Sequence, residues 1–126
     1  MNIDKASKIF IAGHNGMVGS ACKRLLISKG YNNLVCLPSN ELDLRKQKKV
    51  FDFLKSEKPD VVINAAAKVG GIMANKTYPY EFLYDNLQIQ NNLINGSFEN
   101  NISKFIFLGS SCIYPKMSLQ PIKEEY

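Results

Sequence analysis

The apolar residues of this chain follow two alternating patterns. Short runs rich in β-forming apolar residues occur at residues 8–12 (KIFIA), 34–37 (LVCL), 60–64 (DVVIN) and 104–109 (KFIFLG). Runs that are apolar throughout are typical of strands buried on both faces of a sheet. Residues 41–44 are a further, very short strand candidate. The pattern therefore predicts four or five buried strands.

Between these runs, apolar residues recur at the three- and four-residue spacing of helices. Residues 17–29 form the first such segment, a second runs from residue 43 or 44 to about 57, and a third runs from 79 to about 100. In the first segment the spacing places Val18 and Leu25 on the inward face. Strands that alternate with helices predict an α/β fold.

Helices between buried strands indicate a parallel sheet covered on both faces. Right-handed crossovers then give a doubly wound, Rossmann-type sheet, for which we expect the strand order 3-2-1-4-5. The chain stops after the last predicted strand without a closing helix. We therefore expect residues 1–126 to be an incomplete nucleotide-binding domain from the start of a longer protein, truncated before a C-terminal substrate domain.

A glycine-rich turn joins the first strand to the first helix. Residues 13–19 read G-x-x-G-x-x-G, from Gly13 through Gly16 to Gly19. The first glycine permits a tight turn, the second lets backbone approach a pyrophosphate, and the third lets the helix pack on the sheet. The alternative is a turn without a ligand. His14, the one histidine, is interpreted as a turn or packing residue.

Three segments together resemble a known family. The turn AGHNGMVGSA, the run AAAKVGGIMAN after the central strand, and LGSSCIYPK after the last strand are similar to extended short-chain dehydrogenases/reductases, and in particular to the GDP-L-fucose synthase family. The resemblance implies an NADP-dependent epimerase and reductase of a GDP-4-keto-6-deoxy-hexose. It also implies a GDP-sugar substrate and a homodimer of the full-length protein.

The resemblance further implies site residues. Ser110 matches the serine whose hydroxyl bonds the C4 oxygen of the sugar, and Cys112 matches the cysteine that shuttles protons, although a small buried hydrophobe is the competing role for Cys112. Asp43 and Leu44 match the pair that contacts adenine, with a helix N-cap as the competing role of Asp43. The implied cofactor-binding set is Gly13, Asn15, Gly16, Met17, Val18, Gly19, Ser39, Asn40, Glu41, Asp43, Leu44, Ala65, Ala66, Ala67, Leu108, Gly109, Ser110 and Ser111.

The sequence departs from the family pattern in two ways. No Y-x-x-x-K unit occurs, and the second acid/base histidine is missing, so we expect this chain alone to be inactive. Members that prefer NADP carry arginines at the positions of Asn15 and Ser39, so NAD stays open as the cofactor. Gly70-Gly71 is either a loop near the nicotinamide or sugar, or a flexible turn. Asn86 lies either near the cofactor or on a solvated helix face.

The composition narrows the classes of protein to which this chain can belong. There are 16 Lys and Arg against 11 Asp and Glu, a net charge of +5, but the basic residues are scattered except at residues 45–49 (RKQKK). That run is interpreted as a solvated helix face, and we expect no nucleic-acid partner. No apolar run approaches the roughly 18 residues of a membrane span, and no secretory signal is expected. Three cysteines without metal-ligand spacing indicate free thiols in a reducing cytoplasm and no metal site.

Two other functions stay open at this stage. A related enzyme acting on another GDP-ketosugar, such as a heptose, needs the same motifs, whether it performs 4-reduction or 3,5-epimerisation. A non-catalytic module that only binds a dinucleotide also fits the glycine-rich turn.

Overall fold

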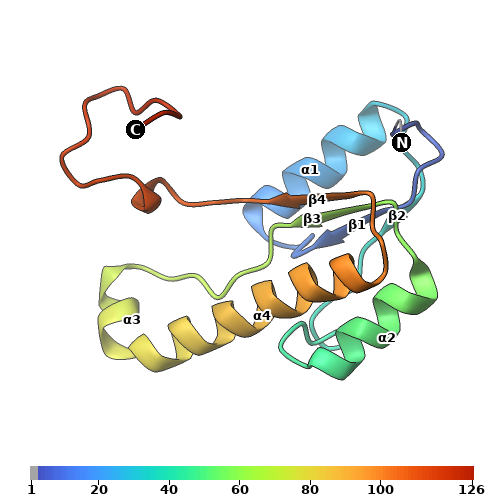
Figure 1. Ribbon diagram of the computed structural model, residues 1–126, viewed down its shortest axis with the longest axis horizontal. Helices are drawn as coiled ribbons and strands as arrows, with labels where there is room; N and C mark the ends of the chain where they lie inside the picture. Colours follow the sequence, from blue (N-terminus) through green and yellow to red (C-terminus); the bar gives the residue numbers. More distant parts are fainter. Residues whose placement is uncertain (1–2) are drawn as a thin grey trace.

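The computed structural model describes residues 3–126 as one parallel sheet with helices on both faces (Figure 1). The strands are β1 (Ile9–Ala12), β2 (Leu34–Val35), β3 (Val61–Asn64) and β4 (Lys104–Phe107). They lie in the order β2-β1-β3-β4 and pair in parallel throughout. The predicted doubly wound fold is therefore confirmed.

Five helical segments connect or follow these strands. They are α1 (Met17–Ser28), α2 (Gln47–Glu57), α3 (Ile72–Thr77), α4 (Pro79–Glu99) and the 3-10 helix η1 (Ser111–Ile113). Pro79 occupies the first turn of α4, as predicted. After β4 the chain extends away from the sheet, in the red segment of Figure 1.

The strands alternate their side chains between two layers of core. Phe10 and Val62 face the side covered by α2 and α4, where they pack with Leu54 and Leu93. Ile11 and Ile63 face the opposite side, which α1 covers. All four residues of β1 and all four of β3 are buried, which explains why both strands are apolar except at Asn64, the last residue of β3.

The strand candidate at residues 41–44 is wrong. The Pro38 carbonyl accepts both the Glu41 and the Leu42 N–H at 3.0 Å, so this segment is a turn. Leu42 is buried in the core, and this burial produces the apolar pattern without a strand. The remaining strands keep the predicted relative order.

Several boundaries also differ from the prediction. Helix α2 begins at Gln47 rather than at residue 43 or 44, and β2 contains only two residues. Val18 and Leu25, expected on the inward face of α1, are exposed. Within residues 3–126, no helix is both long and apolar enough to cross a membrane.

Candidate cofactor site

The glycine-rich turn lies where the strand order reverses. The chain leaves β1 toward β2 on one side, while β3 pairs with β1 on the other side. Ligands of doubly wound sheets bind in the crevice at such a switch point. Gly13 has φ +78°, and a Cβ there would lie 2.7 Å from backbone atoms of Ala65. The turn therefore passes directly against the chain that leaves β3.

The N-terminus of α1 lies at this crevice, where its N-cap residue lines the cleft, and it has no side-chain cap. Its N-cap is Gly16, no side chain caps the first turn, and no acidic residue occupies it. The first N–H groups of a helix have no partner within the helix, and the helix dipole makes them attractive to an anion. A Cβ on Gly19 would lie 2.2 Å from the Gly13 carbonyl oxygen, so only glycine fits there. This local arrangement suits a diphosphate.

A cleft of about 510 Å³ opens beside this turn. Its volume falls within the usual range for small-molecule sites. The sequence-predicted residues that line it are Gly13, Asn15, Gly16, Ser39, Asp43, Leu44, Ala65, Ala66 and Ala67. The structure thus brings together three separate segments of the predicted set.

A second cleft, of about 260 Å³, adjoins the first along Ala65–Ala67. Val18 and Leu108 from the predicted set line it, together with Asn64 and Asn86. Because the shared residues have methyl side chains, they leave space on both sides. The two clefts follow the end of the sheet from β1 toward β4.

Other predicted residues line neither cleft. Met17 is 87% exposed, and Asn40 and Glu41 are exposed beside the Pro38 turn. Ser110 and Cys112 are exposed after β4, where the Ser110 Oγ accepts the Cys112 backbone N–H at 3.1 Å. Gly19 is buried under the turn, and Gly109 is exposed after β4. The side chain of Ser111 lies outside the described part of the structure.

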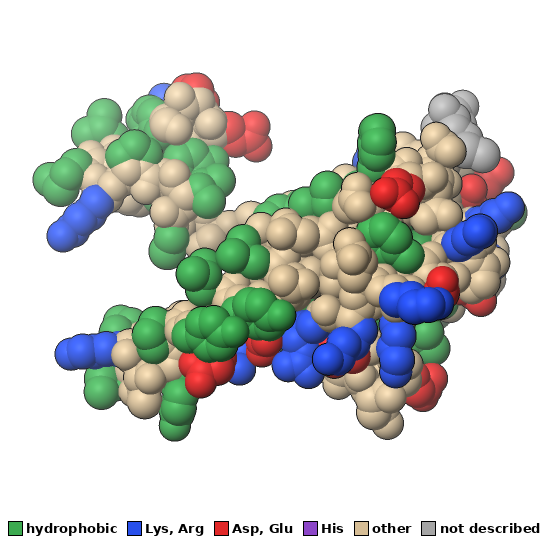
Figure 2. Space-filling view, turned by 60° about the horizontal axis from the view of Figure 1, so that its bottom comes forward, with side chains coloured by type: hydrophobic (Ala, Val, Ile, Leu, Met, Phe, Trp, Pro, Cys, Tyr) green, Lys and Arg blue, Asp and Glu red, His purple; other side chains and the backbone are tan. Residues whose placement is uncertain are grey.

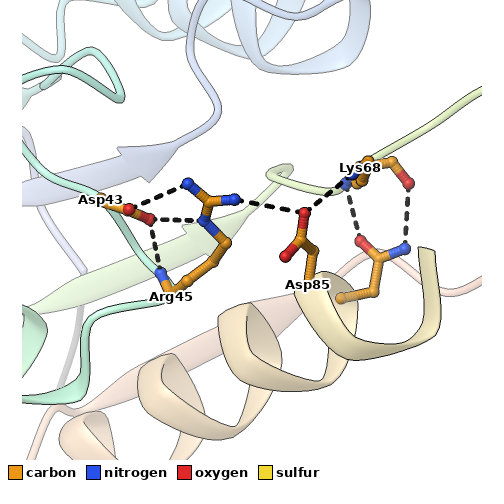
Figure 3. A network of polar contacts seen from close by, with 5 residues as sticks. Asp43, Arg45, Lys68 and Asp85 are labelled. Atoms are coloured by element: carbon orange, nitrogen blue, oxygen red, sulfur yellow. Dashed lines mark hydrogen bonds and ion pairs between the residues drawn. The ribbon is translucent and has the colours of Figure 1, made fainter. Parts of the chain in front are cut away.

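A polar network on the cleft wall was not predicted from the sequence (Figure 3). Arg45 contacts Asp43 through Nε at 2.9 Å and through Nη2 at 3.0 Å. Its Nη1 reaches Asp85 on α4 at 3.3 Å, and Lys68 Nζ reaches the same Asp85 oxygen at 3.1 Å. Three segments that surround the cleft are thereby joined.

This network perturbs two of its charged groups. The hydrogen bonds from the Arg45 side chain are the main cause that lowers the pKa of Asp43, and burial opposes them. The Asp43 hydrogen bond is likewise the main cause that raises the pKa of Arg45. Asp43 is therefore a carboxylate across the physiological range. It acts as an acceptor, which can hold a donor such as an amino group.

Two asparagines of α4 fix the walls of the cleft. The Asn86 amide bonds both the N–H and the carbonyl of Lys68, at 2.7 and 3.0 Å. Asn92 is buried and donates its Nδ2 to the Leu44 carbonyl at 2.9 Å. Asn86 therefore holds the loop after β3, a role that differs from a purely solvated helix position. Asn92 had no signal in the sequence, because asparagines are frequent in this helix.

The charge of the main cleft bears on the cofactor. Arg45 and Lys68, the cationic side chains that line it, are both paired with aspartates. Asn15 and Ser39 add no charge. His14 also lines the cleft, and its Nδ1 is buried without a hydrogen-bond partner among the described residues. A dinucleotide fits the uncapped helix end and the cleft size, while a 2′-phosphate finds no unpaired cationic side chain in the cleft lining.

Comparison with known proteins identifies several relatives of this chain. The chain is 56% identical over 121 residues to GDP-L-fucose synthase 1 of Arabidopsis thaliana. It is 51% identical over 117 residues to the GDP-L-fucose synthase of Escherichia coli K12. A solved structure, the GDP-mannoheptose C4 reductase of Campylobacter jejuni with NADP bound, is similar with a TM-score of 0.92 and 45% identity.

These relatives are much longer than this chain. The alignments cover 96%, 93% and 99% of this chain, but 38%, 36% and 40% of the respective relatives. Residues 9–126 match the NAD dependent epimerase/dehydratase family. Since that match includes the glycine-rich turn, both clefts and the segment after β4, this chain belongs to the NAD dependent epimerase/dehydratase family.

Proposed function

We propose that residues 1–126 are the incomplete Rossmann domain of an NADP-dependent enzyme that converts GDP-4-keto-6-deoxy-D-mannose to GDP-L-fucose. The observation that carries the cofactor assignment is the uncapped N-terminus of α1 at the edge of the main cleft. The identities of 56% and 51% to GDP-L-fucose synthases support the substrate. The substrate-binding domain is then part of the protein outside this chain.

The proposed cofactor-binding residues are divided among the parts of the dinucleotide. We assign the diphosphate to the Gly13–Gly19 turn with Met17 and Val18, and the adenine to Asp43 and Leu44. The segment Ser39–Glu41 is assigned to the adenosine ribose. Ala65–Ala67, with Leu108–Ser111, form the path toward the nicotinamide. The similar NADP-bound reductase supports NADP, while the neutral residues at 15 and 39 keep NAD as the alternative.

Ser110 and Cys112 are the proposed catalytic residues. Ser110 Oγ already accepts the Cys112 backbone N–H, so its own proton is available to the C4 oxygen of the sugar. A donor at that oxygen stabilises the negative charge that develops when a neighbouring proton is removed. The exposed Cys112 thiol is proposed to move the protons at the epimerised carbons. The bound nicotinamide would supply the hydride for the reduction.

Two alternative functions are each supported by a specific observation. The similarity to the GDP-mannoheptose C4 reductase favours a related GDP-heptose as a second substrate class, with reduction alone or epimerisation alone. The lack of a Y-x-x-x-K unit in these 126 residues favours a non-catalytic dinucleotide-binding module. For the same reason we propose that this chain alone does not turn over substrate.

The proposed homodimer follows from an exposed apolar surface, and the proposed cellular compartment follows from the cysteines. Helix α4 exposes large apolar side chains at heptad spacing, namely Tyr80, Tyr84, Leu87, Ile94 and Phe98, and we name this set the α4 stripe. Figure 2 shows hydrophobic side chains over α3 and the first half of α4. We propose that the α4 stripe contributes to a homodimer of the full-length protein. The three cysteines are free, which supports a reducing cytoplasm.

The test uses the protein expressed from its complete gene. It is supplied with GDP-4-keto-6-deoxy-mannose and NADPH, and absorbance at the nicotinamide band is followed. Product NMR in deuterated water then shows whether solvent deuterium enters C3 and C5. Cofactor oxidation with deuterium at both carbons supports the proposal. Oxidation without deuterium favours simple reduction, and no oxidation with bound NADPH favours the non-catalytic module.

A further inference from the structure

The Asp43 carboxylate has one acceptor position left after Arg45 is counted. Its Oδ1 accepts the Arg45 backbone N–H at 3.0 Å and Nε at 2.9 Å, and its Oδ2 accepts Nη2 at 3.0 Å. A carboxylate offers about four acceptor positions in total. Three of them are thus used by a single residue, and the remaining one belongs to Oδ2. Asp43 also lines the main cleft.

Arg45 cannot easily swing away from this position. The remaining guanidinium nitrogen, Arg45 Nη1, contacts Asp85 at 3.3 Å. The Asp85 side chain is 13% exposed and also binds Lys68 (Figure 3). Asp85 lies on α4, the 21-residue helix that packs on the sheet. The same helix holds Leu44 through Asn92. The guanidinium therefore joins the Asp43 carboxylate to a rigid element, and a planar fork with two contacts fixes orientation better than a single ammonium does.

An ionised carboxylate in a fixed orientation selects between purines. Adenine presents a 6-amino donor, whereas guanine and hypoxanthine present a 6-oxo acceptor at the same position. A fixed acceptor pairs with the donor and repels the oxo group. Since Arg45 favours the charged form of Asp43, the carboxylate has no proton to offer a 6-oxo group. The Asp43 side chain is 24% exposed, and a bound base that covers it without offering a donor would leave its desolvation uncompensated and reduce affinity.

We infer that Arg45 is a positioning residue that makes the Asp43 carboxylate select 6-amino purines and reject 6-oxo purines in the cofactor cleft. This inference rests on the proposed cofactor site. It has a functional consequence, because the proposed substrate itself carries a guanine nucleotide. The Arg45–Asp43 pair would keep that guanine out of the cleft that adenine occupies.

The experiment measures binding rather than turnover, in the protein expressed from its complete gene. NADPH is compared with deamino-NADPH, in which an oxygen replaces the 6-amino group, by the fluorescence change of the reduced nicotinamide. The variants are Arg45→Met, Arg45→Lys and Asp85→Asn. Lys48→Met is the control, since Lys48 pairs with Asp52 on the exposed face of α2 and its loss changes the net charge as much as Arg45→Met does. Thermal unfolding checks that each variant is folded.

We expect the wild type and Lys48→Met to bind NADPH about tenfold or more tightly than deamino-NADPH. In Arg45→Met this preference for NADPH over deamino-NADPH is expected to fall to about threefold or less. Arg45→Lys and Asp85→Asn should have preferences between those of the wild type and Arg45→Met. If Arg45→Met is not folded, the other two variants supply the ratio. An unchanged ratio in the folded variants, even with weaker binding, overturns the inference alone. If wild-type protein binds neither dinucleotide, the proposed cofactor site fails and the inference fails with it.

Discussion

The side-chain amide of Asn86 pairs with both backbone groups of Lys68, accepting its N–H at 2.7 Å and donating to its carbonyl at 3.0 Å. The Asn86 side chain, on α4, thereby supplies the hydrogen-bond partners of these two backbone groups in the loop after β3. The next residue back, Asp85, holds the Lys68 side chain as well. Two adjacent helix residues thus fix the position of the chain that separates the two clefts.

Replacing this amide tests its contribution. Asn86→Ala leaves the two Lys68 backbone groups without their partner, and we expect a loss of about 1–3 kcal/mol in the free energy of unfolding. Because Lys68 lines the main cleft, NADPH affinity should also fall severalfold. Urea unfolding and NADPH titration measure the two effects. Asn91→Ala, at an exposed position of the same helix, is the control and should change stability by less than about 0.5 kcal/mol. Equal behaviour of the two variants would refute the role of Asn86.

The glycines of the first turn should separate binding from stability. A Cβ at residue 16 meets only the Gly13 carbonyl, at 3.3 Å, so Gly16→Val is expected to fold. Its branched side chain would occupy the approach to the phosphates, so dinucleotide binding should be lost.

Gly19→Ala should instead lower stability by about 1–3 kcal/mol, because its Cβ would overlap the Gly13 carbonyl. Gly71→Ala, where a Cβ meets nothing within 4 Å, is the control in calorimetry and binding. Wild-type affinity in Gly16→Val would place the diphosphate elsewhere.

The Asp43–Arg45 contact predicts a pH dependence of stability. The pKa of Asp43 in the folded protein is below its usual value of 3.8, so the contact stabilises the fold above that pH. The stability difference between wild type and Asp43→Asn should be constant from pH 7 to about 5 and should shrink as pH falls through the lowered pKa. Since both side chains are partly exposed, the difference is expected to be about 1 kcal/mol or less. Urea unfolding at stepped pH measures it. A difference that grows toward acid would contradict the assigned direction.

The sequence allowed the main elements to be predicted because their signals are local. Each residue of β1 and β3 is buried and all but Asn64 are apolar, so the apolar run itself was a sufficient signal. The proline at the start of α4 and the three glycines of the turn are equally local signals. Helix α3 was missed because six residues are too short for a helical pattern, and it buries none of them. The false strand at 41–44 arose from Leu42, whose burial in a turn resembles the burial of a strand residue.

The polar network on the cleft wall could not be predicted from the sequence. Arg45 and Asp85 are 40 positions apart, and Lys68 and Asp85 are 17 apart. Only the crossover from β3 through α4 brings these charges together, and no local pattern marks a contact of that range. Residues 45–49 also looked like a plain basic helix face, although Arg45 precedes α2 and turns back to Asp43. Lys and Arg side chains do gather over α2 (Figure 2).

The α4 stripe predicts the effect of charge on assembly. Ile94 and Phe98 are 48% and 81% exposed, and a lysine at either position would place a charge within the proposed helix contact. Ile94→Lys and Phe98→Lys should convert a dimer of the full-length protein to monomer at micromolar concentration, as measured by light scattering. Leu25→Lys, an exposed apolar position on α1, should leave the dimer intact. A monomeric wild type, or dimers in all variants, would show that the stripe is not the interface.

The segment after β4 predicts a separation of the two chemical steps. Cys112→Ser in the full-length protein replaces the thiol with a weaker acid, so proton removal at the sugar carbons should slow by about a hundredfold. Hydride transfer needs the donor at the C4 oxygen, which is Ser110, and should be affected less. Solvent deuterium incorporation at C3 and C5 measures the first step, and NADPH oxidation with a pre-epimerised ketosugar measures the second. Ser110→Ala is the matched variant and should slow both, because the same oxygen carries charge in both steps. If Cys112→Ser exchanges deuterium at the wild-type rate, another group moves these protons, and Cys112 serves only to present its backbone N–H to Ser110.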